Sequence, residues 1–213
     1  MKDIETWKID GHTLEYINES HTYICDGVVV SSITQMLKLK FGGKYNGVSK
    51  SVLQKASEKG TMVHEAIEKY CKYGYESDLP ELRNFKFIQR AYKFDVIENE
   101  VPVILSFDGK PVSAGRLDLV IEKIGEDGVL HGERGIADIK RTSTLDKEYL
   151  AYQLNLYRIA YQQCYGTKID FLKGIHLREE KRKYVDIPIN EEMAIELVKE
   201  YIENNKSDSE DNL

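Results

Sequence analysis

Gly115-Arg116-Leu117-Asp118 and, twenty residues later, Asp138-Ile139-Lys140 are the stretches that decide the fold. Each carboxylate lies in or at the end of a short apolar run, and such runs between glycines and charged residues are typical of β-strands. The turn signal Gly125-Glu126-Asp127-Gly128 separates the two runs. We therefore predict a β-hairpin that brings Asp118 and Asp138 side by side.

Lys140 is expected on the same strand face as Asp138, because side chains along a strand alternate with a period of two. Two carboxylates and an ammonium group that meet at the edge of a sheet can hold a hard divalent cation and the water that it activates. This is the chemistry of phosphodiester hydrolysis.

Length and composition indicate one globular domain. The chain has 213 residues, of which 31% are charged and 41% hydrophobic, an ordinary profile for a soluble protein. No apolar run approaches the ~20 residues that a membrane span requires, and residues 1–10 do not resemble a signal peptide. We predict a single domain over residues 1–205, an acidic disordered tail over 206–213, and no membrane partner.

Cysteine usage fits a reducing compartment. Cys25, Cys71 and Cys164 are far apart, so the chain has neither a disulfide framework nor a paired-cysteine metal site. A cytoplasmic location fits best.

The net charge of −6 argues against nucleic-acid binding, because phosphate contacts are made with lysine and arginine. The objection is limited, since part of the acidity lies in the tail and a metal site needs carboxylates of its own. Net charge describes solubility and steering rather than local binding.

Hydrophobic periodicity predicts alternating helices and strands. The expected strands and hairpins cover Thr13–Val30, Glu98–Phe107, the hairpin of Asp118 and Asp138, Ile169–Arg178 and Lys183–Ile187. The expected helices cover Ile33–Leu39, Ser49–Tyr73 in two pieces joined near Gly60, Pro80–Val96, Lys147–Tyr165, and a last helix from the N-cap Asn190 to about Ile202. This order predicts an α/β fold with a central mixed β-sheet flanked by helices and an N-terminal β-hairpin.

Four motifs in order resemble the RecB-type branch of the PD-(D/E)XK nuclease superfamily: Gly60-x-x-x-His64, Gly115-x-x-Asp118, Asp138-x-Lys140 and Gln153-x-x-x-Tyr157. The opening hairpin, with His21-Thr22-Tyr23, is similar to that of small phage-encoded members. The resemblance covers about residues 11–177. It implies a restriction-endonuclease-like core.

The resemblance also implies a Mg²⁺ or Mn²⁺ site. Its ligands would be Asp118, Asp138, His64 and the carbonyl oxygen of Ile139, and an imidazole ligand favours Mn²⁺ somewhat. Lys140 would lie near the scissile phosphate, where it orients or helps to deprotonate the attacking water. Asp118, Asp138 and Lys140 are thus the expected catalytic residues.

Two further roles follow from the resemblance and from position. Gln153 and Tyr157 are four residues apart, hence on one helical face, and family members use this pair to contact the DNA backbone. Glu100 is expected to begin a strand and to serve as a supporting or second-metal carboxylate. The other histidines receive no catalytic role: His12, His21, His131 and His176.

Ordinary structural explanations remain open for these residues. Asp118 and Asp138 can be solvated hairpin carboxylates, and Lys140 a surface lysine at a strand end. His64 can be a satisfied residue of an amphipathic helix, and Gln153 with Tyr157 part of an aromatic stripe.

The sequence therefore predicts a metal-dependent DNA nuclease, an exonuclease in phage-type replication or recombination in the host cytoplasm. The expected partners are DNA and a single-strand annealing protein, and homo-oligomer formation is left open. Three isolated cysteines cannot build the four-cysteine iron–sulfur site of some RecB-type nucleases. The alternatives are a catalytically silent nuclease fold that acts as a DNA- or protein-binding or inhibitory module, and an unrelated α/β interaction module.

Overall fold

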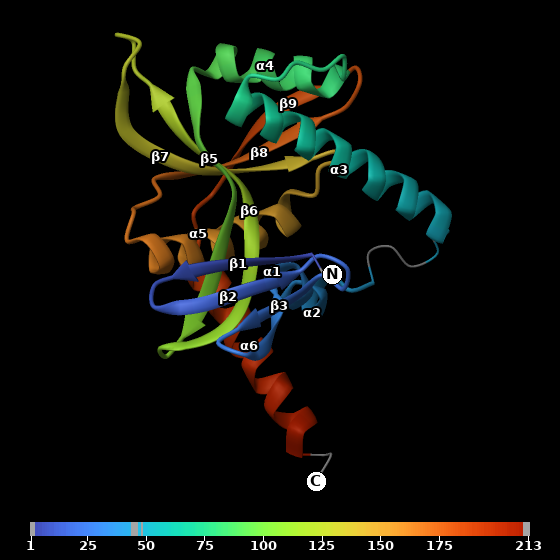
Figure 1. Ribbon diagram of the computed structural model, residues 1–213, viewed down its shortest axis with the longest axis vertical. Helices are drawn as coiled ribbons and strands as arrows, with labels where there is room; N and C mark the ends of the chain where they lie inside the picture. Colours follow the sequence, from blue (N-terminus) through green and yellow to red (C-terminus); the bar gives the residue numbers. More distant parts are fainter. Residues whose placement is uncertain (1–2, 44–46, 48, 211–213) are drawn as a thin grey trace.

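The computed structural model describes residues 3–43, 47 and 49–210. Over these residues the chain forms a mixed nine-stranded sheet, ordered β1-β2-β3-β4-β6-β7-β8-β9 with β5 paired to β6 (Figure 1). The strands are β1 Ile4–Ile9, β2 His12–Ile17, β3 Thr22–Cys25, β4 Val28–Ser32, β5 Phe94–Phe107, β6 Lys110–Ile124, β7 Leu130–Lys140, β8 Phe171–Leu177 and β9 Arg182–Ile187. The helices are α1 Ile33–Met36, α2 Lys38–Phe41, α3 Lys50–Tyr73, α4 Pro80–Tyr92, α5 Lys147–Tyr165 and α6 Glu191–Glu210.

This architecture confirms the predicted α/β class, with a central mixed sheet, flanking helices and an N-terminal β-hairpin. The predicted hairpin residues 13–30 form β2, β3 and most of β4, and β1 adds an antiparallel partner to β2. Strands β5, β6 and β7 are antiparallel neighbours, whereas β7 pairs with β8 in parallel. Helix α5 connects β7 to β8, as a parallel connection requires.

The predicted hairpin of Asp118 and Asp138 is confirmed, because β6 and β7 pair with Leu119 opposite Ala137. The expectation that the two carboxylates lie at a sheet edge is wrong. Strand β6 lies between β5 and β7, and β7 lies between β6 and β8. The acidic pair therefore lies inside the sheet, where neighbouring strands can add further side chains.

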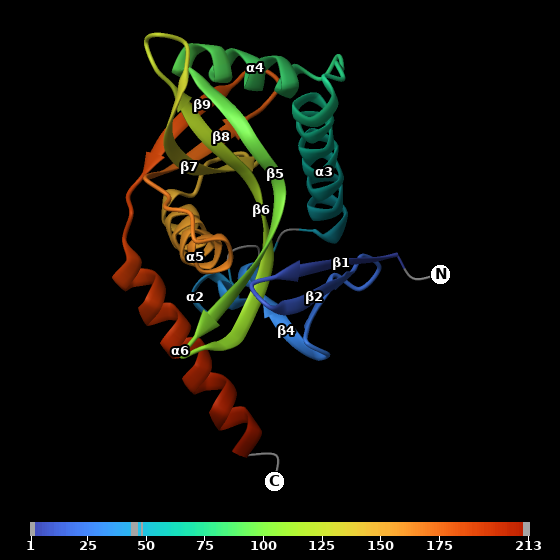
Figure 2. The ribbon, with the colours of Figure 1, turned by 60° about the vertical axis from the view of Figure 1, so that its left-hand side comes forward.

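Helices cover both faces of the sheet. Residues of α1, α5 and α6 pack with the β5–β7 strands in one core cluster, and residues of α3 and α4 pack with β6–β8 in another. A third cluster joins the N-terminal strands to β5 and β6 through Leu14, Tyr16 and Ile104. Figure 2 shows α3 and the N-terminal strands on one side of the β5–β6 ribbon, opposite α5 and α6. Residues of α3, of the N-terminal strands and of β6 line one cavity.

Several element boundaries differ from the prediction. Helix α3 runs unbroken through Gly60, and the expected helix at 33–39 is divided into α1 and α2. Helix α4 stops at Tyr92 rather than at Val96, because Lys93 takes a left-handed backbone (φ 50°) and β5 starts at Phe94. Strand β1 was not expected, although its exposed residues alternate with partly or fully buried ones.

Helix α6 continues past the expected end at about Ile202 to Glu210. Asn190 caps it as predicted, since its Oδ1 accepts a hydrogen bond from the Met193 backbone N at 3.1 Å. The last residues of the predicted tail, 211–213, lie outside the described residues. Within the described part of the chain, no helix is long and apolar enough to cross a membrane.

Candidate metal centre

Three carboxylates lie in one row across three neighbouring strands. The pairs Val101–Leu117 and Asn99–Leu119 set Glu100 opposite Asp118, and the same register from Leu119–Ala137 sets Asp118 opposite Asp138. Glu100, Asp118 and Asp138 all line one cavity. Strand register therefore gathers acidic groups that are distant in sequence.

Asp118 uses its two carboxylate oxygens differently. Its Oδ2 accepts a hydrogen bond from the Ile139 backbone N at 2.6 Å, which ties the side chain to β7. Its Oδ1 lies 3.7 Å from Nδ1 of His64. One oxygen is thus held by the fold, and the other is directed at the histidine.

His64 reaches the row from α3, which packs on the sheet through the buried Val63 and Ile67. Its Nε2 lies 3.1 Å from the carbonyl oxygen of Ile139. A carbonyl oxygen only accepts hydrogen bonds, so Nε2 carries a proton. Nδ1 then faces Asp118 and also Oε1 of Glu100, which is 3.8 Å away.

Glu100 lies in the middle of β5, not at its start as predicted. Its backbone has φ 50°, a left-handed conformation that is uncommon for a residue other than glycine. Its Oε2 accepts an ion-paired contact of 3.0 Å from Nε of Arg116, and Oε1 faces His64. The unusual backbone thus occurs at a side chain that joins the arginine to the histidine.

Asp138, the third carboxylate of the row, lies near the end of β7 and is accompanied there by Lys140. Lys140 Nζ lies 2.6 Å from Asp138 Oδ2, which confirms that the two side chains share a strand face. The Asp138 side chain is 3% exposed and that of Lys140 is 24% exposed. Although the pair is close, Oδ2 accepts no hydrogen bond of good geometry among the described residues, so it retains acceptor capacity.

The pKa values of these groups reflect burial and mutual charge. Burial raises the pKa of Asp118, and it raises that of Asp138 to about 6 against the opposing effect of Lys140. Burial alone would lower the pKa of His64, but the carboxylates of Asp118, Glu100 and Asp138 outweigh it and raise the value to about 9. For Lys140 the same two aspartates outweigh burial and raise its pKa.

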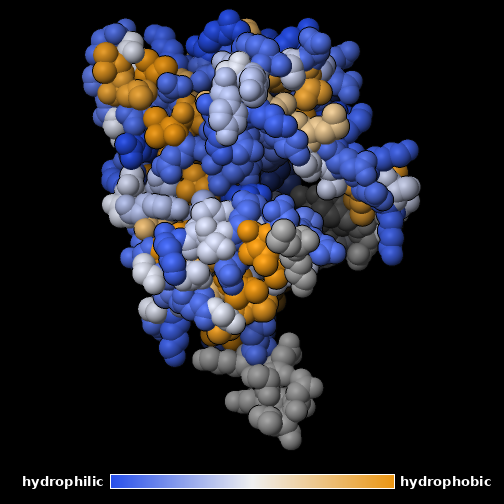
Figure 3. Space-filling model, in the orientation of Figure 1, coloured by the Kyte–Doolittle hydropathy of each residue, from blue (hydrophilic) through white to orange (hydrophobic). Residues whose placement is uncertain are grey.

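The row opens into a cavity of about 390 Å³. From α5, Gln153 and Tyr157 line it as predicted, and Gln153 Oε1 is buried with no hydrogen-bond partner among the described residues. An adjoining cavity of about 550 Å³ contains His64, and the two share Tyr16, His21, Glu100 and Arg116. Figure 3 shows a hollow surrounded by hydrophilic residues between α3 and the N-terminal strands.

The structure thus brings together all the predicted site residues: His64, Glu100, Asp118, Asp138, Ile139, Lys140, Gln153 and Tyr157. The two cavities also contain lining residues that were not predicted, and Arg116 is the most polar of them. Arg116 stands two residues before Asp118 in one strand, so period-two alternation could have placed it on the same face. Tyr16, His21 and Tyr23 come from the N-terminal hairpins. The stretch His21-Thr22-Tyr23 was part of the resemblance to small phage-encoded members, but no site role was assigned to it.

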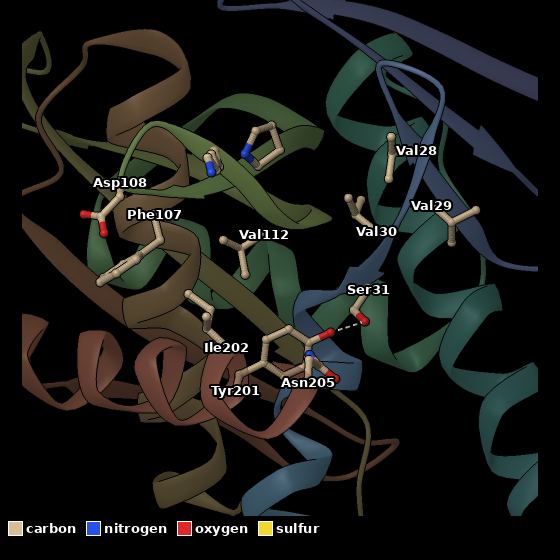
Figure 4. Close-up of a pocket in the computed structure, with 12 residues that line it drawn as sticks. Val28, Val29, Val30, Ser31, Phe107, Asp108, Val112, Tyr201, Ile202 and Asn205 are labelled. Carbon is tan, nitrogen blue, oxygen red and sulfur yellow. Dashed lines mark hydrogen bonds between the residues drawn. The ribbon is translucent and has the colours of Figure 1, made fainter. Parts of the chain in front are cut away.

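Another cavity, of about 570 Å³, lies between β4, the β5–β6 turn and α6 (Figure 4). Its lining is mostly apolar, with Val28–Val30 on one side and Ile202 on the other, and Tyr201 hydrogen-bonds Ser31. Its charged lining residues, Asp108 and Lys110, form no acidic row. Among the described residues of this lining, Asp108 is the single carboxylate, and no histidine or cysteine accompanies it.

Neither a family model nor a curated protein matches the sequence. A solved structure described as "Crystal structure of SSO0001" aligns with 84% of this chain and 77% of that chain, at a TM-score of 0.45 and 13% identity. A similarity at this level supports no conclusion about function. The chemistry of the cavity has to carry the functional proposal.

Proposed function

We propose that the protein is a Mg²⁺- or Mn²⁺-dependent deoxyribonuclease with a restriction-endonuclease-like core. The observation that carries this proposal is the surroundings of His64 Nδ1. Nε2 donates to Ile139, and Nδ1 faces Asp118 and Glu100 at 3.7 and 3.8 Å. In the metal-free site Nδ1 carries a proton at pH 7, because the pKa of His64 is raised to about 9; once a metal ion displaces that proton, the lone pair points at the same two carboxylates. Three electron-rich atoms then converge on one point, which favours a cation there.

The donor set fits a small divalent cation. The ligand atoms offered by His64, Glu100 and Asp118 all lie within 4.8 Å of one another. Carboxylate oxygens suit Mg²⁺ and Mn²⁺, and one imidazole moves the preference toward Mn²⁺. The carbonyl oxygen of Ile139 has a second lone pair, and Asp138 is one position along the row. A bound cation would supply an activated water and would stabilise charge that develops on a phosphate.

Lys140 acts as an ammonium group in this proposal. Because its pKa is raised, it keeps its proton at neutral pH and is a poor base. It would orient the attacking water together with Asp138 and would neutralise charge on the phosphate. We therefore propose that Lys140 orients the attacking water rather than deprotonates it.

Gln153 and Tyr157 are the proposed contacts to the DNA backbone. The unpartnered Gln153 Oε1 lies in the cavity wall, and a buried amide without partners favours a ligand that supplies them. The exonuclease label, the phage-type pathway, the cytoplasmic location, the annealing-protein partner and any homo-oligomer rest on the resemblance to small phage nucleases alone.

The test is cleavage of end-labelled linear and circular DNA with Mg²⁺ or Mn²⁺. We expect the wild type to degrade linear DNA only, and Lys140→Ala or Asp118→Asn to lower the rate at least 100-fold. Lys123→Ala is a matched control, because Lys123 pairs with Glu133 outside the cavity. Cleavage of circular DNA would show that the protein is not an exonuclease. Equal rates for the wild type and Lys140→Ala would contradict the proposed mechanism.

Failure to cleave any DNA would favour the catalytically silent alternative. Calorimetric titration with Mn²⁺ then separates the remaining cases. If the wild type binds Mn²⁺ and Asp118→Asn does not, the protein is a metal-binding fold without catalytic turnover. If the wild type binds no Mn²⁺, the proposed metal site is wrong as well.

A further inference from the structure

His21 lies where the two cavities of the candidate site meet. It lines the cavity of Asp118, Asp138 and Lys140 and also the adjoining cavity of His64. It belongs to the turn between β2 and β3, whose strands pair with Ile17 opposite Thr22. The exposed imidazole of His21 therefore reaches the site from the β2–β3 turn, whereas the acidic row lies on β5, β6 and β7.

The ring of His21 is held in place. Its Nδ1 lies 2.6 Å from the hydroxyl oxygen of Tyr16, and Tyr16 is nearly buried. The guanidinium of Arg116 lies over the Tyr16 ring, 5.5 Å from its centroid, and Arg116 in turn pairs with Glu100 and Glu5. A continuous set of contacts therefore joins the acidic row to His21.

The turn itself does not require a histidine. His21 has φ 51°, a backbone that asparagine adopts equally well at a turn. The imidazole adds what an amide cannot: a ring whose one nitrogen is fixed by Tyr16 while the other can carry a transferable proton.

We propose that His21 is a catalytic residue that protonates the departing sugar oxygen, and that Tyr16 is the residue that positions it. This inference rests on the proposed nuclease function and completes it, since Lys140 and the acidic row serve the attacking water. As the phosphorus–oxygen bond breaks, its electron pair stays on the sugar oxygen, which takes the proton from His21 Nε2. The ring is left neutral with its proton on Nδ1, which donates to the Tyr16 oxygen, and solvent restores the Nε2 proton.

The decisive experiment compares two substrates under single-turnover conditions with one metal. One is an ordinary oligonucleotide, and the other carries sulfur in place of the bridging oxygen that departs. A thiolate leaves without a proton, so the sulfur substrate does not need the acid. His21→Asn keeps the turn conformation and is the main variant. Tyr16→Phe removes only the hydroxyl, and His12→Asn is the control, because His12 pairs with Asp26 and lines neither cavity.

For the oxygen substrate we expect His21→Asn to lower the maximal rate about 100-fold with little change in KM, and Tyr16→Phe to lower it about fivefold. On the sulfur substrate both variants should come within threefold of the wild type, whereas Lys140→Ala should stay impaired on both substrates. Equal losses for His21→Asn on both substrates, or no loss on either, would overturn the inference while the nuclease function stands. If the wild type cleaves neither substrate, the proposed function fails and the inference with it.

Discussion

The ring of Tyr157 lies so close to Gly115 that it leaves no room for a side chain at that position. A β-carbon on Gly115 would lie 2.9 Å from Tyr157 Cε1 and 3.2 Å from its hydroxyl oxygen. The Gly115 backbone is not in the left-handed region, so close approach rather than dihedral freedom explains the glycine. The contact ties the Gly115-x-x-Asp118 motif on β6 to the Gln153-x-x-x-Tyr157 motif on α5.

Gly115→Ala should therefore push Tyr157 away from β6. We expect it to lower the free energy of unfolding by about 1–3 kcal/mol, as overpacking of a core does, and to lower nuclease activity. Urea unfolding measures the first effect. Gly60→Ala is the matched control: a β-carbon there meets nothing within 4 Å inside α3, so this variant should be more stable by about 0.5–1 kcal/mol. Equal stability of the two variants would contradict the contact.

Metal binding should release a proton. The pKa of His64 is raised to about 9 in the metal-free site, so the ring is protonated at pH 7 and a cation at Nδ1 must displace that proton. Affinity should therefore rise up to tenfold per pH unit from pH 7 and level off near pH 9. Below pH 6 it should fall more steeply, because the carboxyl of Asp138, with a pKa of about 6, also takes up a proton.

Calorimetry in two buffers with different ionisation enthalpies measures this release. We expect close to one proton per cation at pH 7 for the wild type and fewer for His64→Ala. An affinity for Mg²⁺ that is the same at pH 7 and pH 8.5 would show that His64 is not a ligand.

The ion pair of Glu81 with Arg141 should stabilise the fold next to the site. Arg141 Nε lies 2.7 Å from Glu81 Oε1, and the Glu81 side chain is only 2% exposed. Glu81→Ala leaves a largely buried arginine and should cost about 3 kcal/mol of unfolding free energy. Because Arg141 follows Lys140, activity should fall as well. Glu179→Ala is the control: Glu179 contacts the same arginine at 3.3 Å but is 63% exposed, so its loss should cost below about 1 kcal/mol.

The cysteines should be unreactive in the folded protein. Burial raises the pKa of Cys71 to about 12, and it also raises the pKa values of Cys25 and Cys164. Since the thiolate is the nucleophile, alkylation at pH 8 should be far slower in the native state than in urea, where all three thiols react. Rapid labelling of the folded protein would contradict the packing around these residues.

Local patterns determined the helices and strands. The bounds predicted for α5 agree with the structure because its ends carry local signals: Asp146 accepts a hydrogen bond from the Tyr149 backbone N, and Gly166 ends the helix in a left-handed conformation. The β6–β7 hairpin likewise follows from alternation and a turn. Boundaries were missed where a local preference was weak, as at Gly60, since a glycine inside a helix costs only about 1 kcal/mol and α3 continues through it.

Motif order also pointed to the residues that meet in the cavity, but not to how they meet. His64 donates to the carbonyl oxygen of a residue far along the chain, and Glu100 takes a left-handed backbone to face it. These relations depend on strand register and on how α3 lies across the sheet.

By itself, then, the sequence determined most of the secondary structure and the α/β class, since those follow from periods of two and 3.6 residues. It also determined the residue types available for chemistry. Only the tertiary structure decided that the acidic row lies inside the sheet, that Arg116 joins it, and that His21 lines the same cavity. Cross-strand register and helix packing bring together groups from distant parts of the chain, and no local period encodes that.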